Sequence, residues 1–356
     1  MHFALPPKKT WQPPLYARTG VRLPANSRRR QQLQLGGYAV LALLTLYLLW
    51  SCIAPSRSWT PDGEIELNPK IVIVTMFDDR GTSREYRNMI RKNREHYAGL
   101  HGYSLFHTNV STYLDVLETE PSHPSPPTSW AMVPALRHAL KLHPDATYLW
   151  YLSDQAFITE PSYSLSEHIF SNLSALMQKD VPVVPPDSVI HTFSHLKPAH
   201  ANLILTQDMD NLANTNLILR NTKRTSSNTD NWAHFFLDAW FDPLYRQYSF
   251  QKAENHALEH LVQWHPTILA KLVLIPQRQL NSYNFRYKPV VENDVPREHD
   301  AMWRDGDFVI NLKGCDDDEK NMANGIFDRN NGRVCEAELR QFYQRWERKL
   351  LANKEK

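Results

Sequence analysis

The chain has 356 residues, of which 42% are hydrophobic, and its 40 lysines and arginines nearly balance its 38 aspartates and glutamates. Seven of the basic residues and none of the acidic ones lie within residues 1–35, so the remainder carries a net negative charge. This division argues against nucleic acid binding, which needs a basic surface on the folded part. The remainder is long enough for one large domain.

The first predicted element is a transmembrane helix. Residues 31–56 carry no formal charge, and residues 38–54 are almost entirely apolar. About 20 helical residues span the hydrocarbon core of a bilayer, and positively charged flanks stay in the cytosol. A cleaved signal peptide is the alternative, but this basic leader is too long for one. The predicted organisation is a cytosolic basic tail (1–35), a signal anchor (36–54), a luminal stem (55–69) and a folded luminal domain (70–352).

Cysteines and sequons agree with a luminal location. Apart from Cys52 in the predicted anchor, the chain contains only Cys315 and Cys335. In an oxidising compartment, a disulfide closing this loop of about 20 residues would contribute about 3 kcal/mol. Two unrelated buried thiols are the alternative. Asn109 and Asn172 begin N-x-S/T triplets and are candidate glycosylation sites.

The folded domain alternates predicted strands and helices. Residues 70–76 (KIVIVTM) form a β-branched run typical of a strand buried on both faces, and a helix follows over 83–102, capped by Thr82 or Ser83. Further strands are predicted at 103–107, 148–152, 271–275 and 308–312, short apolar runs at 203–205 and 217–219, and further helices at 130–143, 232–241, 255–264 and 336–351. The aromatic stripe of the helix at 232–241 is predicted to be core: Trp232, Phe235, Phe236 and Trp240. This order predicts an α/β fold with a Rossmann-like, mixed and mostly parallel sheet flanked by helices.

Acidic residues follow two of the predicted strands. Asp78 and Asp79 come after the first strand, and Asp154, between Ser153 and Gln155, comes after the apolar run at 148–152. Ligands of such sheets bind beyond the carboxyl ends of the strands, so we expect these residues on one rim, with Thr75 nearby. A carboxylate there can hold a divalent cation against the diphosphate of a nucleotide sugar.

Four stretches of the sequence resemble glycosyltransferase family 34, and within it the fungal Golgi subunits that build the α-1,6-mannan backbone. They are RKNREHYAGLHGYSLF (91–106), SWAMVPALRHALKLHPDATYLWYLSDQAFI (129–158), LVQWHPTILAKLVLIPQRQLNSYN (261–284) and GDFVINLKGC (306–315). The resemblance runs from about Lys70 to Tyr343. It implies a GT-A-like domain in the Golgi, a nucleotide-sugar donor, a glycan acceptor, retention of anomeric configuration, a Mn²⁺ ion and homologous mannosyltransferase subunits as partners. The donor would be GDP-mannose in the mannan-building branch and a UDP-sugar in the galactosyl and xylosyl branches.

The sequence departs from this family pattern at the expected metal site. The two aspartates of the Asp-x-Asp motif fall on Ser153 and Gln155, which leaves Asp154 between them as the candidate catalytic and metal-binding carboxylate. A late histidine that joins the metal in the family falls on Asn311. Alternate side chains of an extended segment point to opposite sides, so Asp154 would face away from the usual metal position. Three hypotheses stay open: a shifted metal site with Asp78 or Asp79, a partner-dependent or non-catalytic subunit, and a metal-free transferase.

Other polar positions are expected around the donor and the acceptor. A family glutamine near the acceptor falls on Asn255, a second catalytic candidate, and a family asparagine near the donor sugar falls on Ala213. Lys313 is a candidate contact of the diphosphate, although a solvated lysine fits equally well. Of three histidines on the helix at 255–264 and its end, His256 is favoured as structural, whereas His260 and His265 are open between the two roles. The predicted nucleotide-sugar contacts are Thr75, Asp78, Asp79, Ser153, Gln155, Asn214, Asn216, His265 and Lys313.

Overall fold

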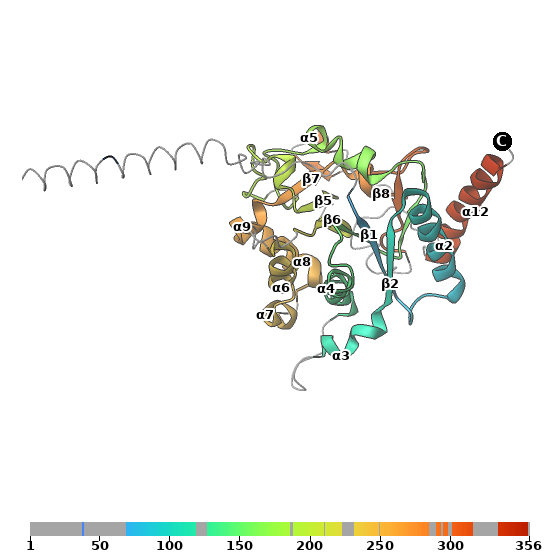
Figure 1. Ribbon diagram of the computed structural model, residues 1–356, viewed down its shortest axis with the longest axis horizontal. Helices are drawn as coiled ribbons and strands as arrows, with labels where there is room; N and C mark the ends of the chain where they lie inside the picture. Colours follow the sequence, from blue (N-terminus) through green and yellow to red (C-terminus); the bar gives the residue numbers. More distant parts are fainter. Residues whose placement is uncertain are drawn as a thin grey trace, which may run out of the picture. The chain divides into compact units, whose positions relative to one another are not determined.

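The computed structural model in Figure 1 describes residues 38, 69–118, 127–185, 188–209, 211–222, 231–248, 250–284, 290–292, 295–297, 301–315 and 334–354. The predicted tail, the anchor apart from Tyr38, and the stem apart from Pro69 lie outside these residues. Among the described helices, none combines the length and the apolar character needed to cross a membrane. All elements discussed below belong to one compact unit, residues 62–356.

The domain is built on a six-stranded mixed sheet with the strand order β2-β1-β3-β6-β5-β7. Neighbouring strands pair in parallel except at β6, which runs antiparallel to both β3 and β5. The predicted mixed α/β architecture is therefore confirmed. The carboxyl ends of β1, β3, β5 and β7 share one edge with the amino end of β6, and we call this edge the carboxyl rim. The strands are β1 (Ile71–Phe77), β2 (Ser104–Asn109), β3 (Tyr148–Leu152), β5 (Leu203–Gln207), β6 (Leu212–Arg220) and β7 (Leu272–Ile275).

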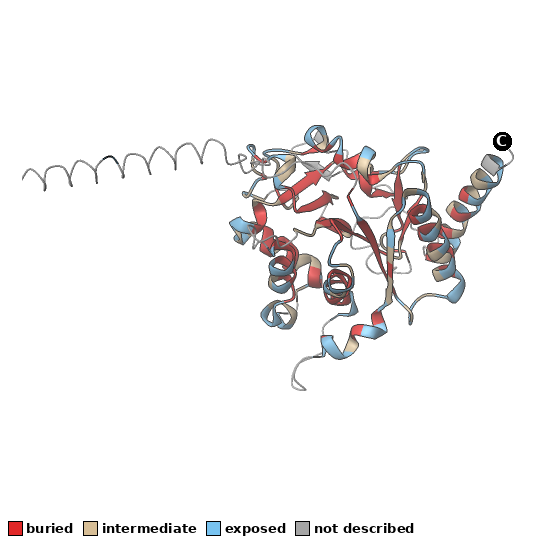
Figure 2. Ribbon diagram, viewed as in Figure 1, coloured by how far each residue is buried: buried red, intermediate tan, exposed pale blue. Residues whose placement is uncertain are grey.

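Helices cover both faces of this sheet. On one face lie α4 (Met132–Leu142), α6 (Trp232–Trp240) and α8 (Ala253–Trp264), and on the other lies α2 (Arg84–His101) beside α12 (Cys335–Lys354) (Figure 1). Every residue of β1 (IVIVTMF) and β3 (YLWYL) is buried (Figure 2). The double cover explains this, because each strand packs apolar side chains in both directions.

Helix α2 begins and ends at residues that the sequence predicts. Ser83 Oγ accepts a hydrogen bond from Tyr86 N–H (3.0 Å) at the amino end. Gly102 adopts the left-handed conformation at the carboxyl end, with φ of 68°, which a residue with a Cβ rarely takes. Two polar residues of this helix, Asn93 and Arg94, are fully buried on the side that faces the sheet. They matter for the site described below.

A second, three-stranded sheet has the order β4-β11-β8. It contains β4 (Ala156–Ile158), β11 (Val309–Asn311) and β8 (Ser282–Tyr283), with β11 antiparallel to β4 and parallel to β8. Cys315, after β11, forms a disulfide with Cys335, the first residue of α12, across a Cα–Cα distance of 4.9 Å. Both half-cystines pack in an apolar cluster with Phe77 of β1, so the bond ties α12 to the domain.

The remaining elements are short. They are η1 (Val110–Tyr113), α3 (Leu114–Leu117), η2 (Thr128–Ala131), the π-helical turn η3 (Ser166–Phe170), α5 (Leu173–Leu176), η4 (Pro198–His200), α7 (Pro243–Gln247), α9 (Pro266–Leu269), α10 (Gln277–Leu280), β9 (Val290–Glu292) and β10 (Val295–Arg297). The predicted core stripe of α6 is confirmed for Trp232, Phe236 and Trp240. It is wrong for Phe235, which is 49% exposed.

Candidate active site

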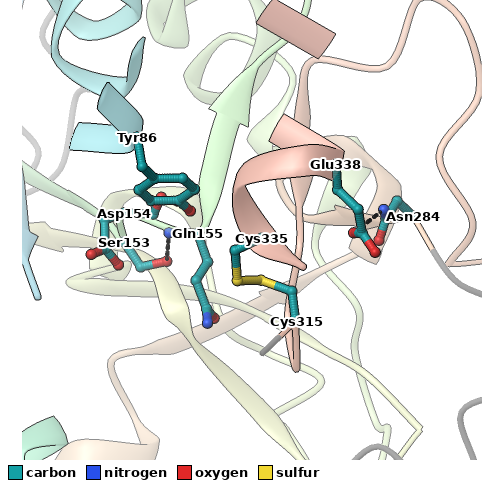
Figure 3. The surroundings of a disulfide bond; sticks show 8 residues. All are labelled: Tyr86, Ser153, Asp154, Gln155, Asn284, Cys315, Cys335 and Glu338. Carbon is teal, nitrogen blue, oxygen red and sulfur yellow. Dashed lines mark hydrogen bonds between the residues drawn. A yellow bond between two sulfur atoms is a disulfide. The ribbon is translucent and has the colours of Figure 1, made fainter. Parts of the chain in front are cut away.

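Strand β3 turns into β4 through Ser153, Asp154 and Gln155. Ala156 N–H donates to Ser153 C=O (3.1 Å), which closes a β-turn with Asp154 and Gln155 at its centre. The side chains of these two residues leave the turn in different directions, with Gln155 directed towards the side of the Cys315–Cys335 disulfide (Figure 3). Asp154 supplies the only carboxylate of the turn, and this carboxylate points in a different direction from the Gln155 side chain. Gln155 is one of the two positions that carry aspartate in the family motif.

Two buried side chains of α2 hold this turn, and we call Asn93 and Arg94 the turn clamp. Arg94 donates to the backbone C=O of Ser153 (3.2 Å) and of Ala156 (2.6 Å). Asn93 donates to Ile158 C=O (2.9 Å) and accepts from Ile158 N–H (3.0 Å). The clamp lies within the Asn-Arg-Glu-His-Tyr stretch that carries the family resemblance, and it gives that stretch a physical role: it fixes the backbone path from β3 into β4.

The loop after β1 contacts the turn directly. Asp78 N–H donates to Asp154 Oδ2 (2.9 Å), so the ends of β1 and β3 meet at the carboxyl rim, as we expected. The Asp78 side chain accepts from the backbone N–H of Arg80 (3.1 Å) and of Gly81 (2.9 Å). Asp79 instead accepts from the N–H (3.1 Å) and the hydroxyl (2.6 Å) of Ser111. Partial burial raises the pKa of Asp79, but the bonds from Ser111 outweigh this effect and the pKa is lowered.

The Asp154 carboxyl has a strongly shifted pKa. Burial raises its pKa to about 6, and the negative charge of Asp78 adds to the rise, although Asp78 N–H and the Arg94 guanidinium favour the charged form. Burial lowers the pKa of Arg94 to about 9, against the effects of Tyr86 and Asp154. Asp154 therefore changes its charge near pH 6. A carboxyl so perturbed at a strand end is a candidate for a functional role.

Gly81 allows the Asp78 loop to be tested. A Cβ at Gly81 would lie 2.3 Å from Asp78 Oδ2, so Gly81→Ala is expected to displace that carboxylate from its backbone hydrogen bonds. We expect a loss of about 1–2 kcal/mol in the free energy of unfolding. Gly99→Ala is the matched control: it lies in α2 with open space around its Cβ, and alanine should stabilise the helix by about 1 kcal/mol. Urea unfolding measures both variants, and changes of the same sign would contradict the prediction.

A second carboxylate reaches this part of the rim from α8. Glu254 is buried in the first turn of α8, where it accepts hydrogen bonds from the Ser129 hydroxyl and from the Asn214 side-chain amide (3.2 Å). Ala253 before it has a φ of 45°, which is unfavourable for a residue with a Cβ. Burial raises the pKa of Tyr151, and the charges of Asp154 and Glu254 raise it further. Both carboxylates therefore act on Tyr151 near the end of β3.

A third group of charges follows β5. Asp208 is buried one residue after the strand, where it accepts from the Tyr283 hydroxyl (2.8 Å) and forms an ion pair with Lys313. Nearby, Glu259 accepts from Leu212 N–H (3.2 Å), and burial raises its pKa to about 7. Lys313, predicted as a contact of the diphosphate, is thus partly buried with its ammonium group paired to Asp208.

Two predicted donor contacts, Thr75 and Asn216, are fully buried. The Asn216 side chain accepts from Trp150 Nε1 (2.7 Å) and donates to Leu280 C=O, so its oxygen and its nitrogen both make hydrogen bonds within the protein. Asn214 differs because it faces α4 and α8, where its amide lies 3.7 Å from the Met132 sulfur. Of the two asparagines, only Asn214 lies beside a carboxylate of the rim.

Other predicted positions are spread more widely. Asn255 is partly exposed beside Glu254, and its carbonyl oxygen has no hydrogen-bond partner among the described residues. His265 caps the other end of α8, about 16 Å along the helix axis from Glu254, so the structure separates it from the rim group. The glycosylation candidates Asn109 and Asn172 are both exposed.

The side chains at the turn do not fit a manganese ion. Within the described ranges, no three His, Cys, Asp or Glu side chains form a group that could hold a metal. Asn311 is buried and donates to Thr215 Oγ1 (2.8 Å) and Asn281 Oδ1 (2.9 Å), which leaves it one neutral carbonyl oxygen without a partner among these residues. A hard divalent cation prefers several charged oxygen ligands, and here the turn itself supplies Asp154 alone.

Arg94, Glu254 and Asp208 were not among the predicted site residues. Asp208 could have been predicted from the sequence, since it follows an apolar strand as Asp78 does. Glu254 adjoins the predicted Asn255, but the helix was predicted to begin one residue later. Arg94 lies inside a quoted motif, yet only the fold shows that it reaches Ser153, 59 residues further along the chain.

Comparison with known proteins identifies the family. Residues 67–322 match the galactosyl transferase GMA12/MNN10 family. An uncharacterized alpha-1,2-galactosyltransferase of Schizosaccharomyces pombe is 28% identical over 90% of this chain and 89% of its own length. The probable alpha-1,6-mannosyltransferase MNN10 of Saccharomyces cerevisiae is 26% identical over 70% of this chain, which spans only 62% of that relative. A solved glycosyltransferase involved in glycosylation of the PBCV-1 major capsid covers 69% of this chain and 94% of its own, but its TM-score of 0.39 and 9% identity carry no argument. The family match covers most of the folded domain, and the chain belongs to this family of glycosyltransferases.

Proposed function

We propose that this glycosyltransferase transfers mannose from GDP-mannose to mannan or an N-glycan in α-1,6 linkage. One observation carries the proposal: Asp78 N–H donates to the Asp154 carboxylate where β1 and β3 meet, and the charges of Asp154 and Glu254 both raise the pKa of Tyr151. Polar groups from three segments thus border the rim at which α/β sheets bind ligands. Relatives named as probable alpha-1,6-mannosyltransferases, MNN10 and MNN11, support the mannosyl branch.

We further propose a type II membrane location in the Golgi, with homologous mannosyltransferase subunits as partners. The uncharged, apolar run at residues 38–54 and the basic residues before it support a membrane anchor with a cytosolic amino terminus. The family supports a glycan acceptor as the second substrate.

Glu254 is our candidate for the group that stabilises the sugar during transfer. Breaking the bond from the anomeric carbon to the diphosphate builds positive charge on the sugar ring, which a fixed carboxylate stabilises. Glu254 has such a fixed position, because Ser129 and Asn214 bind its two oxygens. Asn255, next in the chain, and Asn214 are then placed to contact sugar hydroxyls. Asp154 and the loop at Asp78 face the nucleotide side.

A galactosyl donor is the second candidate. It is favoured by the names of relatives, since three fission-yeast proteins that match this chain at 26% to 28% identity are called alpha-1,2-galactosyltransferases. In that case the donor would be UDP-galactose. A partner-dependent or non-catalytic subunit is the third candidate. It is favoured by Ser153 and Gln155, because these neutral residues stand where the family motif has aspartates.

Nucleotide-dependent thermal unfolding of the full chain in detergent tests these alternatives. GDP at about 100 times its dissociation constant should add about 2.7 kcal/mol, which raises the midpoint by about 5 °C for a domain of this size. UDP should have a smaller effect, and Asp154→Ala should abolish the shift. Asp145→Ala is the control, because Asp145 pairs with Lys70 at the opposite end of the sheet.

The outcomes separate the candidates. A shift with UDP alone would favour the galactosyl donor, and absence of any nucleotide shift would contradict a transferase that acts alone. Mn²⁺ stays a prediction of the family resemblance. The same titration with and without Mn²⁺ tests it: a nucleotide shift that appears only with Mn²⁺ would support a metal site completed by the nucleotide, and equal shifts would support metal-free binding.

A further inference from the structure

The outer surface of α7 and α8 carries a continuous group of aromatic rings. We define the aromatic track as Tyr245, Tyr248, Phe250, His260 and Trp264. Ring centroids are 4.8 Å apart for Tyr248 and Phe250, 6.1 Å for Tyr245 and Phe250, 5.4 Å for Tyr245 and His260, and 6.0 Å for His260 and Trp264. Trp264 and Tyr248 are 70% and 68% exposed, whereas Tyr245 and Phe250 are partly buried against the core, so the two ends of the track are accessible.

Helix geometry connects this track to the candidate active site. His256, His260 and Trp264 are spaced by four residues, so they share the outward face of α8, whereas Ala257, Leu258, Leu261 and Val262 are buried on the inward face. His256 comes two residues after Glu254, and its ring lies 5.8 Å from that of Phe250. From His256 to Trp264 the helix advances about 12 Å, roughly the length of two hexose units.

The chemistry of the track suits an uncharged, hydroxyl-rich ligand. Aromatic faces pack on the C–H faces of hexose rings, while tyrosine, histidine and tryptophan offer polar atoms at their edges for sugar hydroxyls. No member is a carboxylate, lysine or arginine. Burial lowers the pKa of His256 and of His260, with Lys252 and His265 adding to the effect, which favours the neutral form of both rings. Tyr245 already shows such an edge contact, with its hydroxyl 3.2 Å from His260 Nδ1.

We propose that the aromatic track binds the acceptor glycan, a neutral oligosaccharide of hexoses, beyond the sugar unit that receives the transferred residue. This inference rests on the proposed function and deepens it, because it assigns a surface to the second substrate. Asn255, which is partly exposed between His256 and the buried Glu254, links the track to the site, and this link favours a glycan that leads into the site over a protein partner. The track then selects long acceptors over short ones.

Binding of mannohexaose and mannobiose by isothermal titration calorimetry of the full chain in detergent tests the proposal. The double variant Tyr248→Ala/Trp264→Ala should bind mannohexaose about tenfold more weakly, as expected for two lost ring contacts, with little change for mannobiose. Phe235→Ala is the matched control, since Phe235 is an exposed aromatic residue of α6 outside the track. Its binding should equal that of the unmodified chain.

Three outcomes would overturn the inference: equal binding of mannohexaose by the double variant, an equal loss in Phe235→Ala, or no binding of mannohexaose by the unmodified chain. Self-association that the double variant abolishes, without glycan binding, would assign the face to a second copy and also overturn it. Donor binding is measured separately by the nucleotide-induced thermal shift. Failure of the proposed function therefore appears in that shift, whereas failure of this inference appears only in the glycan titration.

Discussion

Asp154→Asn is expected to stabilise the domain at pH 7 and to impair transfer. Burial raises the pKa of Asp154 from 3.8 to about 6, so between these values the folded chain retains a proton that the unfolded chain loses. Unfolding free energy therefore falls as pH rises through this window, by up to about 3 kcal/mol. Asparagine removes the charge of this partly buried side chain, while its side-chain oxygen still accepts from Asp78 N–H. Loss of the charge at the nucleotide side should lower transfer by about a hundredfold.

Urea unfolding of the unmodified chain and the variant, from pH 4 to pH 7, measures this difference. The stability gain of Asp154→Asn should be small at pH 4 and largest at pH 7. Asp145→Asn serves as the control, because Asp145 forms an exposed ion pair with Lys70 and should change stability by less than about 1 kcal/mol. Parallel pH profiles for Asp154→Asn and the unmodified chain would show that the Asp154 carboxyl carries no such penalty.

Arg94→Met is expected to destabilise the domain by about 3–5 kcal/mol. The substitution leaves the backbone C=O groups of Ser153 and Ala156 without the donor that binds them, and it removes the positive charge that favours ionised Asp154. The β3–β4 turn would lose its fixed geometry. We therefore also expect the nucleotide-induced thermal shift to disappear, even at temperatures at which the variant is folded.

Arg84→Ala is the matched control for Arg94, because Arg84 is an exposed arginine at the start of the same helix. Its effect on the free energy of unfolding should be below about 0.5 kcal/mol. In addition, Asp154→Asn should recover part of the stability that Arg94→Met loses, since it removes the uncompensated charge. A loss below 1 kcal/mol in Arg94→Met would contradict the role given to the turn clamp.

Much of the fold follows from the sequence because local patterns specify it. The β-branched run of β1, the Ser83 and Gly102 caps of α2 and the aromatic run of β3 each identify an element without reference to the rest of the chain. The meeting of Asp78 and Asp154 was also predictable, because parallel neighbours place their carboxyl ends on one edge. The direction of β6 depends on strand pairing, and the separate faces of Asn214 and Asn216 depend on an irregularity in the register of β6 against β5, since residues two apart in a regular strand share a face. A local pattern contains neither.

The polar contacts of the candidate site were less predictable. Burial of Thr75 and Asn311 and the pairing of Lys313 with Asp208 arise from segments up to 105 residues apart. Glu254 owes its position to Ser129, 125 residues earlier. Such contacts require the tertiary structure, whereas the residue types only show that polar groups are present.

The turn clamp has a consequence for how this chain can change over evolutionary time. Arg94 and Asn93 bind main-chain atoms of the β3–β4 connection, so their hydrogen bonds do not require particular side chains at 153 and 155, although Gln155 N–H also donates to Ser153 Oγ (3.3 Å). An exchange between acidic and neutral residues there would leave the hydrogen bonds of the clamp in place. Such a change would alter the affinity of the turn for a cation without removing the hydrogen bonds that Arg94 and Asn93 make.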